Sequence, residues 1–509
     1  MKNPVIPAPI RFDITDGQFA LRSGTAITYP AAPGLAPIAE RFTEEIAKRT
    51  GLRLAPAAQA RPGPDEPSIQ IELGAANELP APQGLSPGGG SPPDERYDLT
   101  ITAGQALVRA AAPVGVARAL TTLTQLLVAS PGGIPGARIA DAPRYAWRGL
   151  SLDLARTYVS PDEIRRVIDL LATYKLNVLH LHLTNDQGWR LPAGRPADSD
   201  HPYREDDLRA LVAYAADRFV TAVPEVDMPG HVEALLAMHP ELIGERNQAA
   251  HPHHADWLDP TLPATFPLVE EVLTAVAGIF PSPYLHLGGD EPWGMPRDLY
   301  VSFVKQARAL VRDLGKRPLG WQESARAGLD PTDIVQYWLS GIAFASSLPP
   351  EVRAKIDADL ALSRHDVEAT ITAKVPVIVS PQGHCYLDVP YAEPSADPAQ
   401  ADRRARVGNP LYAPMTIAQS YDWDPAEALG AEAAGAAQIA GVEAAIWCET
   451  ISDFDDLTFQ LLPRLPGIAE KAWSAPQTWA EHRDRLTQHA RLWEQDDLTY
   501  FRSASVNWR

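Results

Sequence analysis

The chain has 509 residues, 45% of them hydrophobic, and a formal net charge of −19 at pH 7. This acidic balance argues against nucleic acid or an anionic membrane surface as a partner. No run of 18 apolar residues is present, so no membrane-spanning helix is expected. With only Cys385 and Cys448, a disulfide framework is excluded. The first residues lack the apolar core of a signal peptide. We therefore expect a cytoplasmic protein, or a secreted one whose leader has been removed.

Residues 1–143 are predicted to form a small α/β domain of a sheet plus a helix. The stretches SIQIEL (68–73) and YDLTITAG (97–104) alternate apolar and polar residues, as half-buried strands do. The stretch VGVARALTTLTQLLVA (114–129) has apolar residues at helical spacing, and we expect it to cover the sheet. The glycine- and proline-rich SPGGIPG that follows breaks the chain.

Residues 144–509 are predicted to form a (β/α)8 TIM barrel. Three segments have the pattern of amphipathic helices, at 160–175, 204–218 and 297–315. Short apolar runs indicate eight strands, at 149–155, 178–183, 219–227, 284–290, 317–321, 334–338, 376–380 and 442–447. Eight strand-then-helix units favour a closed barrel. An open doubly wound sheet is the alternative, but no glycine-rich phosphate fingerprint follows the first strand.

Acids and tryptophans gather where the predicted barrel strands end. The active site of such a barrel lies at the C-terminal strand ends. Those ends carry Arg156, Asn185, Asp186, Trp189, Asp227, His231, Asp290, Glu291, Trp321, Trp338, Tyr386, Asp388, Trp447 and Glu449. Sugar rings offer apolar faces to aromatic side chains and hydroxyls to charged ones. The set therefore indicates a carbohydrate site, where a carboxylic acid would protonate the leaving oxygen of a glycosidic bond.

The two adjacent carboxylates in YLHLGGDEPW (284–293) restrict the mechanism. Neighbouring strand residues point to opposite faces, and the Cα atoms of Asp290 and Glu291 are about 3.8 Å apart. Two such side chains cannot flank a sugar from opposite sides. Either the second carboxylate comes from another strand, or the substrate supplies its own nucleophile. We expect the two glycines before Asp290 to leave room for the sugar.

HLGGDE resembles the signature of glycoside hydrolase family 20, the β-N-acetylhexosaminidases. The resemblance continues in the family's order through RGLSLDLARTY, LNVLHLHLTNDQGWR, PEVDMPGH, LGWQE, QYW, YLD and IWCET, over most of residues 144–475. It implies an exo-acting, retaining enzyme that removes terminal GlcNAc or GalNAc from an oligosaccharide. The acetamido oxygen of the substrate is then the nucleophile, and an oxazolinium-type intermediate forms. Neither a cofactor nor a metal is expected.

The resemblance also implies individual roles. Glu291 is the general acid and then the general base, while Asp290 orients the acetamido N–H. Tyr386 donates a hydrogen bond to the acetamido oxygen. The pocket wall is formed by three tryptophans, Trp321, Trp338 and Trp447. The outer hydroxyls of the sugar are bound by three charged residues, Arg156, Asp388 and Glu449.

TNDQGW departs from the family at Asn185, where aspartate is usual. In the family that aspartate forms a relay with the histidine that matches His231, beside the general acid. Asn185 carries no charge, and Asp186 has the opposite strand parity. We therefore expect the proton cycling of Glu291 to be tuned differently in this chain.

The remaining histidines and cysteines give weaker signals. His180 and His182 share one strand face, but no third ligand follows at a suitable spacing, so barrel packing is favoured over a metal site. HPHH (251–254) is interpreted as a solvated loop, with a border of the substrate entrance as the alternative. Cys385 and Cys448 are expected to be reduced thiols that face outward, and a bond between them stays open.

The sequence supports three other functions less well. A lacto-N-biosidase-like family member would need a deeper pocket to release a disaccharide. A non-catalytic sugar-binding protein on the same barrel is disfavoured by the intact Asp290, Glu291 and Tyr386. An endo-acting chitinase-like hydrolase would show spaced acids along one strand, as in DxxDxDxE, a pattern the sequence lacks. A homodimer stays open.

Overall fold

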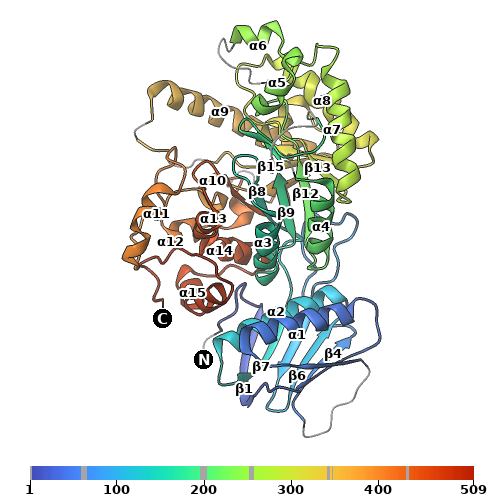
Figure 1. Cartoon of the computed structure of the whole chain (residues 1–509), viewed down its shortest axis with the longest axis vertical. Coiled ribbons are helices and arrows are strands. Elements are labelled where there is room, and N and C mark those ends of the chain that lie inside the picture. Colours follow the sequence, from blue (N-terminus) through green and yellow to red (C-terminus); the bar gives the residue numbers. More distant parts are fainter. Residues whose placement is uncertain are drawn as a thin grey trace.

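The computed structural model describes residues 3–58, 66–194, 203–250, 257–340, 344–346, 348–430 and 435–508. Figure 1 shows a sheet with two helices at one end of the molecule, formed by the N-terminal part of the chain, and the larger barrel region beyond it. Within the described residues, no helix combines the length and apolar character that crossing a bilayer requires.

A seven-stranded mixed sheet forms the N-terminal region, in the order β1-β7-β5-β6-β4-β2-β3. Its strands are β1 (Arg11–Phe19), β2 (Ala26–Tyr29), β3 (Ala55–Ala58), β4 (Ser68–Leu73), β5 (Tyr97–Ile101), β6 (Gln105–Ala110) and β7 (Ile134–Asp141). Helices α1 (Leu35–Thr50) and α2 (Pro113–Ala129) pack on this sheet around a shared apolar core. The predicted strands at 68–73 and 97–104 and the helix at 114–129 are confirmed as β4, β5 and α2.

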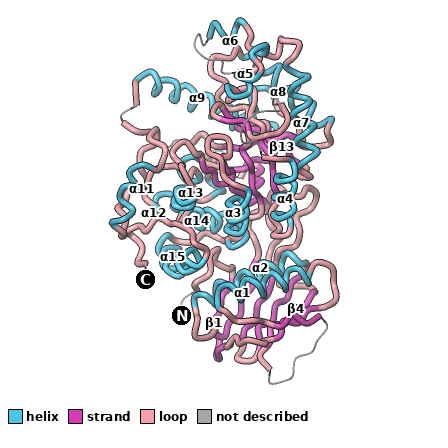
Figure 2. Tube along the Cα trace, viewed as in Figure 1, coloured by secondary structure: helices cyan, strands magenta, loops and turns pink. Residues whose placement is uncertain are grey.

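Eight parallel strands close into a barrel, which confirms the predicted fold and excludes the open doubly wound sheet. They are β8 (Trp147–Asp153), β9 (Val178–His182), β12 (Thr221–Glu225), β13 (Tyr284–His286), β14 (Arg317–Trp321), β15 (Ile334–Tyr337), β16 (Pro376–Val379) and β17 (Gln438–Ile446). Pairing of β17 with β8 closes the ring. Figure 2 shows these strands surrounded by helices and loops, which explains their continuous apolar sequences.

Helices follow most of the barrel strands. They are α3 (Pro161–Thr173), α4 (Glu205–Ala216), α5 (Glu233–Met238), α6 (Glu245–Ala250), α7 (Thr265–Ile279), α8 (Arg297–Asp313), α9 (Pro350–Ala373), α10 (Gln382–Cys385), α11 (Ala401–Arg406), α12 (Ile417–Tyr421), α13 (Phe454–Leu461), α14 (Arg464–Trp473) and α15 (Trp479–Gln495). Helix α3 begins where Ser160 and Glu163 form a reciprocal capping box, with Pro161 at the first helical position.

Shorter elements interrupt the regular alternation. The unit after β14 has the 3-10 helix η2 (Gln322–Ala327) where a regular unit has an α-helix. Three more 3-10 turns occur, η1 (Pro240–Leu242), η3 (Pro398–Gln400) and η4 (Pro425–Glu427). A two-stranded hairpin, β10 (Thr184–Asn185) and β11 (Gly188–Trp189), follows β9 at the mouth of the barrel.

Buried ion pairs join the N-terminal sheet region to the barrel. The Lys175 ammonium lies 3.0 Å from the Asp141 carboxylate at the end of β7. The Arg148 guanidinium on β8 lies 2.7 Å from Glu95. The sheet ends at Asp141 and the first barrel strand begins at Trp147. The division into residues 1–143 and 144–509 stays a prediction.

Candidate active site

A cavity of about 1060 Å³ opens at the C-terminal ends of the barrel strands. Segments that follow all eight strands contribute to its wall. Nine of the predicted site residues line it: Arg156, Asn185, His231, Asp290, Glu291, Trp338, Tyr386, Trp447 and Glu449. Of the eleven residues expected to act in catalysis or sugar binding, the other two, Trp321 and Asp388, are each 1% exposed and lie behind this wall. The structure therefore brings the predicted set together at one end of the barrel.

The adjacent acids Asp290 and Glu291 lie on a loop, because β13 already ends at His286. Strand parity therefore does not govern them, and Glu291 has a left-handed φ of 44°. Their side chains nevertheless converge. Asp290 Oδ2 and Glu291 Oε2 lie 3.4 and 3.6 Å from the same atom, His231 Nε2. Both carboxylates thus lie on one side of the cavity, as expected, although the reason is a loop conformation and not a strand.

Gly288 allows the loop to pass over a buried carboxylate. Its φ is +64°, and a Cβ at this position would lie 1.7 Å from Asp227 Oδ1. Asp227 Oδ1 in turn accepts a hydrogen bond of 3.2 Å from the Gly289 N–H. Burial and the charge of Asp290 raise the pKa of Asp227 well above its ordinary value. Gly288 thus makes room for Asp227, and the expectation that the two glycines leave room for the sugar stays a prediction.

His231 is held between three carboxylates. Its Nδ1 lies 3.0 Å from Asp186 Oδ2, and its Nε2 faces Asp290 and Glu291. Burial disfavours the imidazolium, but the hydrogen bonds to Asp186, Asp290 and Glu291 outweigh burial and hold the pKa of His231 well above its ordinary value. A charged His231 thus lies 3.6 Å from the Glu291 carboxyl group.

The expectation for Asn185 is corrected by this geometry. Asn185 Nδ2 lies 2.9 Å from His182 Nε2, and the carboxylate on His231 belongs to Asp186. Strand parity does not apply to Asp186, because the chain reverses here in the β10–β11 hairpin. Asn185 is the last residue of β10, and Asp186 lies in the turn before β11. The side chain of Asp186 therefore does not follow the alternation of side chains along a strand. A charged relay to His231 is thus present.

Replacing Asp186 with asparagine should lower the pKa of His231, because one of the partners that raise this pKa is lost. The basic limb of the pH–rate profile should then move to lower pH, and kcat/KM above neutrality should fall by at most about 10²-fold. Asn185→Asp should leave that limb in place, because its side chain meets His182. Equal movement of the limb in both variants would contradict the assignment of the relay to Asp186.

Aromatic rings form the wall next to the acids. Trp338 and Tyr386 are stacked with ring centroids 6.1 Å apart, and Trp447 meets Tyr386 edge-on at 5.9 Å. Trp321 lies 5.9 Å from Trp447. Burial, with the charges nearby, raises the pKa of Tyr386 well above its ordinary value. Tyr386 therefore stays protonated and remains a hydrogen-bond donor to the cavity.

Glu323, the acid of the LGWQE motif, is buried in this wall and is a site residue that the sequence alone did not indicate. The Trp338 indole N–H lies 3.1 Å from Glu323 Oε2. Burial and the charge of Asp290 raise the pKa of Glu323 well above its ordinary value. A neutral carboxyl thus fixes the indole plane of Trp338 without adding a further charge beside Asp290.

Charged groups gather at the end of the cavity formed by β8, β16 and β17. Arg156 Nη1 lies 2.9 Å from Asp153 and its Nε lies 3.4 Å from Glu449 Oε1. The Arg156 guanidinium also lies over the Trp447 ring, 5.4 Å from its centroid. Asp388 is buried behind Glu449, and burial and the Glu449 charge raise its pKa well above its ordinary value. This cluster suits the hydroxyls of a sugar.

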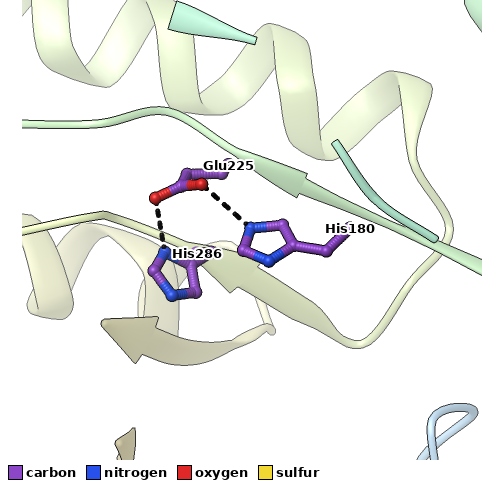
Figure 3. A group of neighbouring side chains, drawn as sticks. All are labelled: His180, Glu225 and His286. Atoms are coloured by element: carbon purple, nitrogen blue, oxygen red, sulfur yellow. Dashed lines mark ion pairs between the residues drawn. The ribbon is translucent and has the colours of Figure 1, made fainter. Parts of the chain in front are cut away.

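Beneath the cavity, Glu225 at the end of β12 contacts three histidines and one tryptophan. Its Oε2 lies 2.7 Å from His182 Nδ1 and 3.1 Å from His180 Nε2. Its Oε1 lies 3.1 Å from His286 Nδ1 and accepts a 2.8 Å hydrogen bond from the Trp321 indole. Figure 3 shows His180 and His286 directed at the two oxygens of Glu225. No role was expected for this acid, because it lies inside the predicted strand 219–227, whereas the expected site residues lie at or beyond the ends of their strands.

His180, Glu225 and His286 offer ligand atoms within 4.8 Å of one another, a spacing that a metal ion could bridge. His180 also meets Glu443 Oε1 at 2.8 Å. Burial disfavours its charge, but Glu225 and Glu443 outweigh burial and raise the pKa of His180 to about 10. A protonated imidazole is no metal ligand, because the ligand must be neutral. The cluster therefore fits a buried ionic network better than a metal site.

The remaining predictions concern Cys385, Cys448 and the histidine loop. Both cysteines are free and buried, and burial raises the pKa of each thiol well above its ordinary value. They are therefore unreactive at neutral pH. HPHH (251–254) lies outside the described residues.

Comparison with known proteins gives consistent matches over almost the whole chain. The model of "Glycosyl hydrolase family 20, catalytic domain" matches residues 145–476, and "Glycosyl hydrolase family 20, domain 2" matches residues 2–142. A β-N-acetylhexosaminidase of Cellulomonas fimi is 33% identical over 530 residues, covering 99% of this chain and 97% of the relative.

Two solved structures have the same overall fold. The family 20 β-N-acetylhexosaminidase of Streptomyces coelicolor A3(2) superposes with a TM-score of 0.81 at 30% identity, covering 100% of this chain and 99% of that one. A mutant Streptomyces plicatus β-hexosaminidase in complex with product (GlcNAc) superposes with a TM-score of 0.80 at 29% identity, covering 100% and 98%.

Proposed function

Because this chain belongs to glycosyl hydrolase family 20 and is a glycoside hydrolase of the β-N-acetylhexosaminidase type, we propose that it removes terminal non-reducing GlcNAc or GalNAc with retention of configuration. The convergence of Asp290 and Glu291 on one nitrogen of His231 carries the proposal. Two acids on one side of a sugar cannot act as acid and opposing nucleophile. The acetamido oxygen of the substrate then fills the second role.

In the first step Glu291 transfers its proton to the glycosidic oxygen as the bond to the anomeric carbon breaks. The acetamido oxygen bonds to that carbon, and an oxazolinium-type ring forms. Asp290 accepts a hydrogen bond from the acetamido N–H and offsets the positive charge that develops on the oxazolinium-type ring. Tyr386 donates a hydrogen bond to the attacking oxygen and orients it.

In the second step water attacks the anomeric carbon from the side that the leaving group vacated. Glu291, now a carboxylate, accepts the proton of that water, and the ring opens to restore the acetamido group. Two inversions give net retention. The Asp186–His231 pair lies beside Glu291 in both steps.

The pocket shape supports release of a single sugar. Stacked Trp338 and Tyr386 fit around the acetamido group, and the ring lies against Trp447. Arg156 and Glu449 line the opposite end and contact the outer hydroxyls, with Asp388 buried behind them. A lacto-N-biosidase-like action would need a further sugar beyond this cluster, where Asp388 is 1% exposed. Exo action on one residue is the better fit.

Aryl glycosides test the substrate-assisted mechanism directly. The aryl β-glycosides of GlcNAc and GalNAc should both be cleaved, while the β-glucoside, which lacks the acetamide, should react at least about 10³-fold more slowly. Initial rates of aryl release at equal concentrations measure this. Robust cleavage of the glucoside would overturn the proposal, because no group of that substrate can replace the acetamido oxygen.

A further inference from the structure

The active-site cavity is larger than one sugar requires. Pockets of about 300–1,000 Å³ hold drug-sized ligands, and one N-acetylhexosamine is smaller than these. The cavity here has about 1060 Å³ and extends from the barrel mouth along α9. Helix α9 is 24 residues long and lies on the side of the barrel away from the N-terminal sheet (Figure 1).

One face of α9 forms the wall of this extension. The residues that line it are Ile356, Asp359, Leu362, His365, Asp366 and Ala369. They recur about every three residues, with the adjacent pair His365 and Asp366 in one turn, so they lie on one side of the helix. Leu362 is 43% exposed, and Leu411, which lines the same cavity, is 45% exposed. Two of the most exposed large apolar side chains in the described part of the chain thus border the active site.

Helix α9 is fixed to the sugar pocket by hydrogen bonds. Arg326 in η2 binds Asp366 of α9 at 2.8 Å, and Gln322 donates to Ser363 at 2.5 Å. The same Gln322 side chain accepts the backbone N–H of Trp338 at 3.0 Å. The wall is therefore preformed relative to the aromatic pocket, and binding against it requires little ordering.

The extension lies on the leaving-group side of the acid. Directly after Glu291, Trp293, Met295 and Arg297 line the same cavity as α9. Arg156 and Glu449 lie at the other end, where β8 and β17 terminate. Since Glu291 must reach the glycosidic oxygen, the group attached to that oxygen must lie toward Trp293 and α9.

We propose that the α9 face, with Leu362 at its centre, together with Leu411 and Trp293 of the same cavity, binds the sugar that follows the scissile bond. This inference rests on the proposed function and specifies its substrate as an oligosaccharide whose second residue contacts α9. A sugar suits the site because it offers an apolar face to Leu362 and Leu411. Its hydroxyls meet Asp359 and His365 of α9 and Arg297 at the start of α8, which line the same cavity.

The test compares chitotriose with methyl β-GlcNAc, whose leaving group is too small to reach α9. In the full chain, Leu362→Asp should lower kcat/KM for chitotriose about tenfold, mainly through KM. It should change the value for the methyl glycoside less than twofold. Ala361→Asp, which adds the same charge at an exposed position beside the wall, is the matched control and should change neither value.

The outcomes separate the possibilities. Equal losses for both substrates, or none for chitotriose, would overturn the role of α9 and leave the proposed function standing. If Leu362→Asp lowered kcat/KM more for octyl β-GlcNAc than for chitotriose, the α9 wall would bind an alkyl aglycone, and the proposal that it binds a sugar would be overturned. Wild-type enzyme that cleaves none of the three would overturn the proposed function itself. The melting temperature of each variant checks that it is folded.

Discussion

The Glu291→Gln variant should lose at least about 10³-fold in kcat/KM toward chitobiose, whose leaving group needs a proton. For dinitrophenyl β-GlcNAc, whose leaving group departs unprotonated, the variant should keep a fraction of the wild-type kcat/KM that is at least about ten times larger than the fraction kept for chitobiose. The reason is that glutamine keeps the size of the side chain but has no acidic proton. Steady-state kinetics on the two substrates measure this difference.

Glu323→Gln is the matched control for this experiment, because it removes a second carboxyl from the same cavity. Glu323 accepts from the Trp338 indole and lies behind the aromatic wall, so its loss should slow both substrates by a similar factor. If Glu291→Gln also slowed both substrates equally, Glu291 would not be the proton donor.

The barrel was predictable because its strands are buried on both faces. Parallel strands of this kind read as continuous apolar runs, and β9 and β13 are buried throughout. The N-terminal strands were harder to find. Most residues of β1 are exposed or half-exposed, and β3 is the short APAA segment with a proline. Neither has the alternation by which a strand is recognised.

Within the site, the residues that follow barrel strands could be predicted from the sequence. The residues that come together only through the register between neighbouring strands could not. The pairing of β12 with β9 sets Glu225 opposite His182, and its pairing with β13 sets Glu225 opposite His286. Three residues more than 40 positions apart thus share one layer. No local pattern in the sequence encodes that register. Asp186 was misjudged for a related reason, since a two-residue turn decides where its side chain points.

The layer beneath the cavity connects fold stability to the sugar site. Glu225 binds His182, which contacts Asn185 and lies edge-on to Trp447 with ring centroids 5.1 Å apart. Glu225 also holds the indole of Trp321. The orientation of two predicted pocket tryptophans therefore depends on one buried carboxylate, which makes Glu225 a positioning residue.

Replacing Glu225 with glutamine should lower the free energy of unfolding by about 3–5 kcal/mol, because a buried imidazolium loses one of its two anions. The double variant Glu225→Gln, His180→Gln removes both charges and should regain part of that loss. Urea unfolding at neutral pH measures both. Glu368→Gln serves as the control, because its pair with His365 is exposed and contributes at most about 1 kcal/mol.

The ion pair between Glu225 and His180 should also make the free energy of unfolding depend on pH. The folded-state pKa of His180 is about 10, above the value of about 6.5 expected in the unfolded chain. Its stabilising effect is therefore complete below about pH 6.5 and is lost as the pH rises toward 10. The unfolding free energy of the wild type should fall across this window, and that of Glu225→Gln should fall less. Equal slopes in the two proteins would mean that Glu225 does not hold the proton on His180.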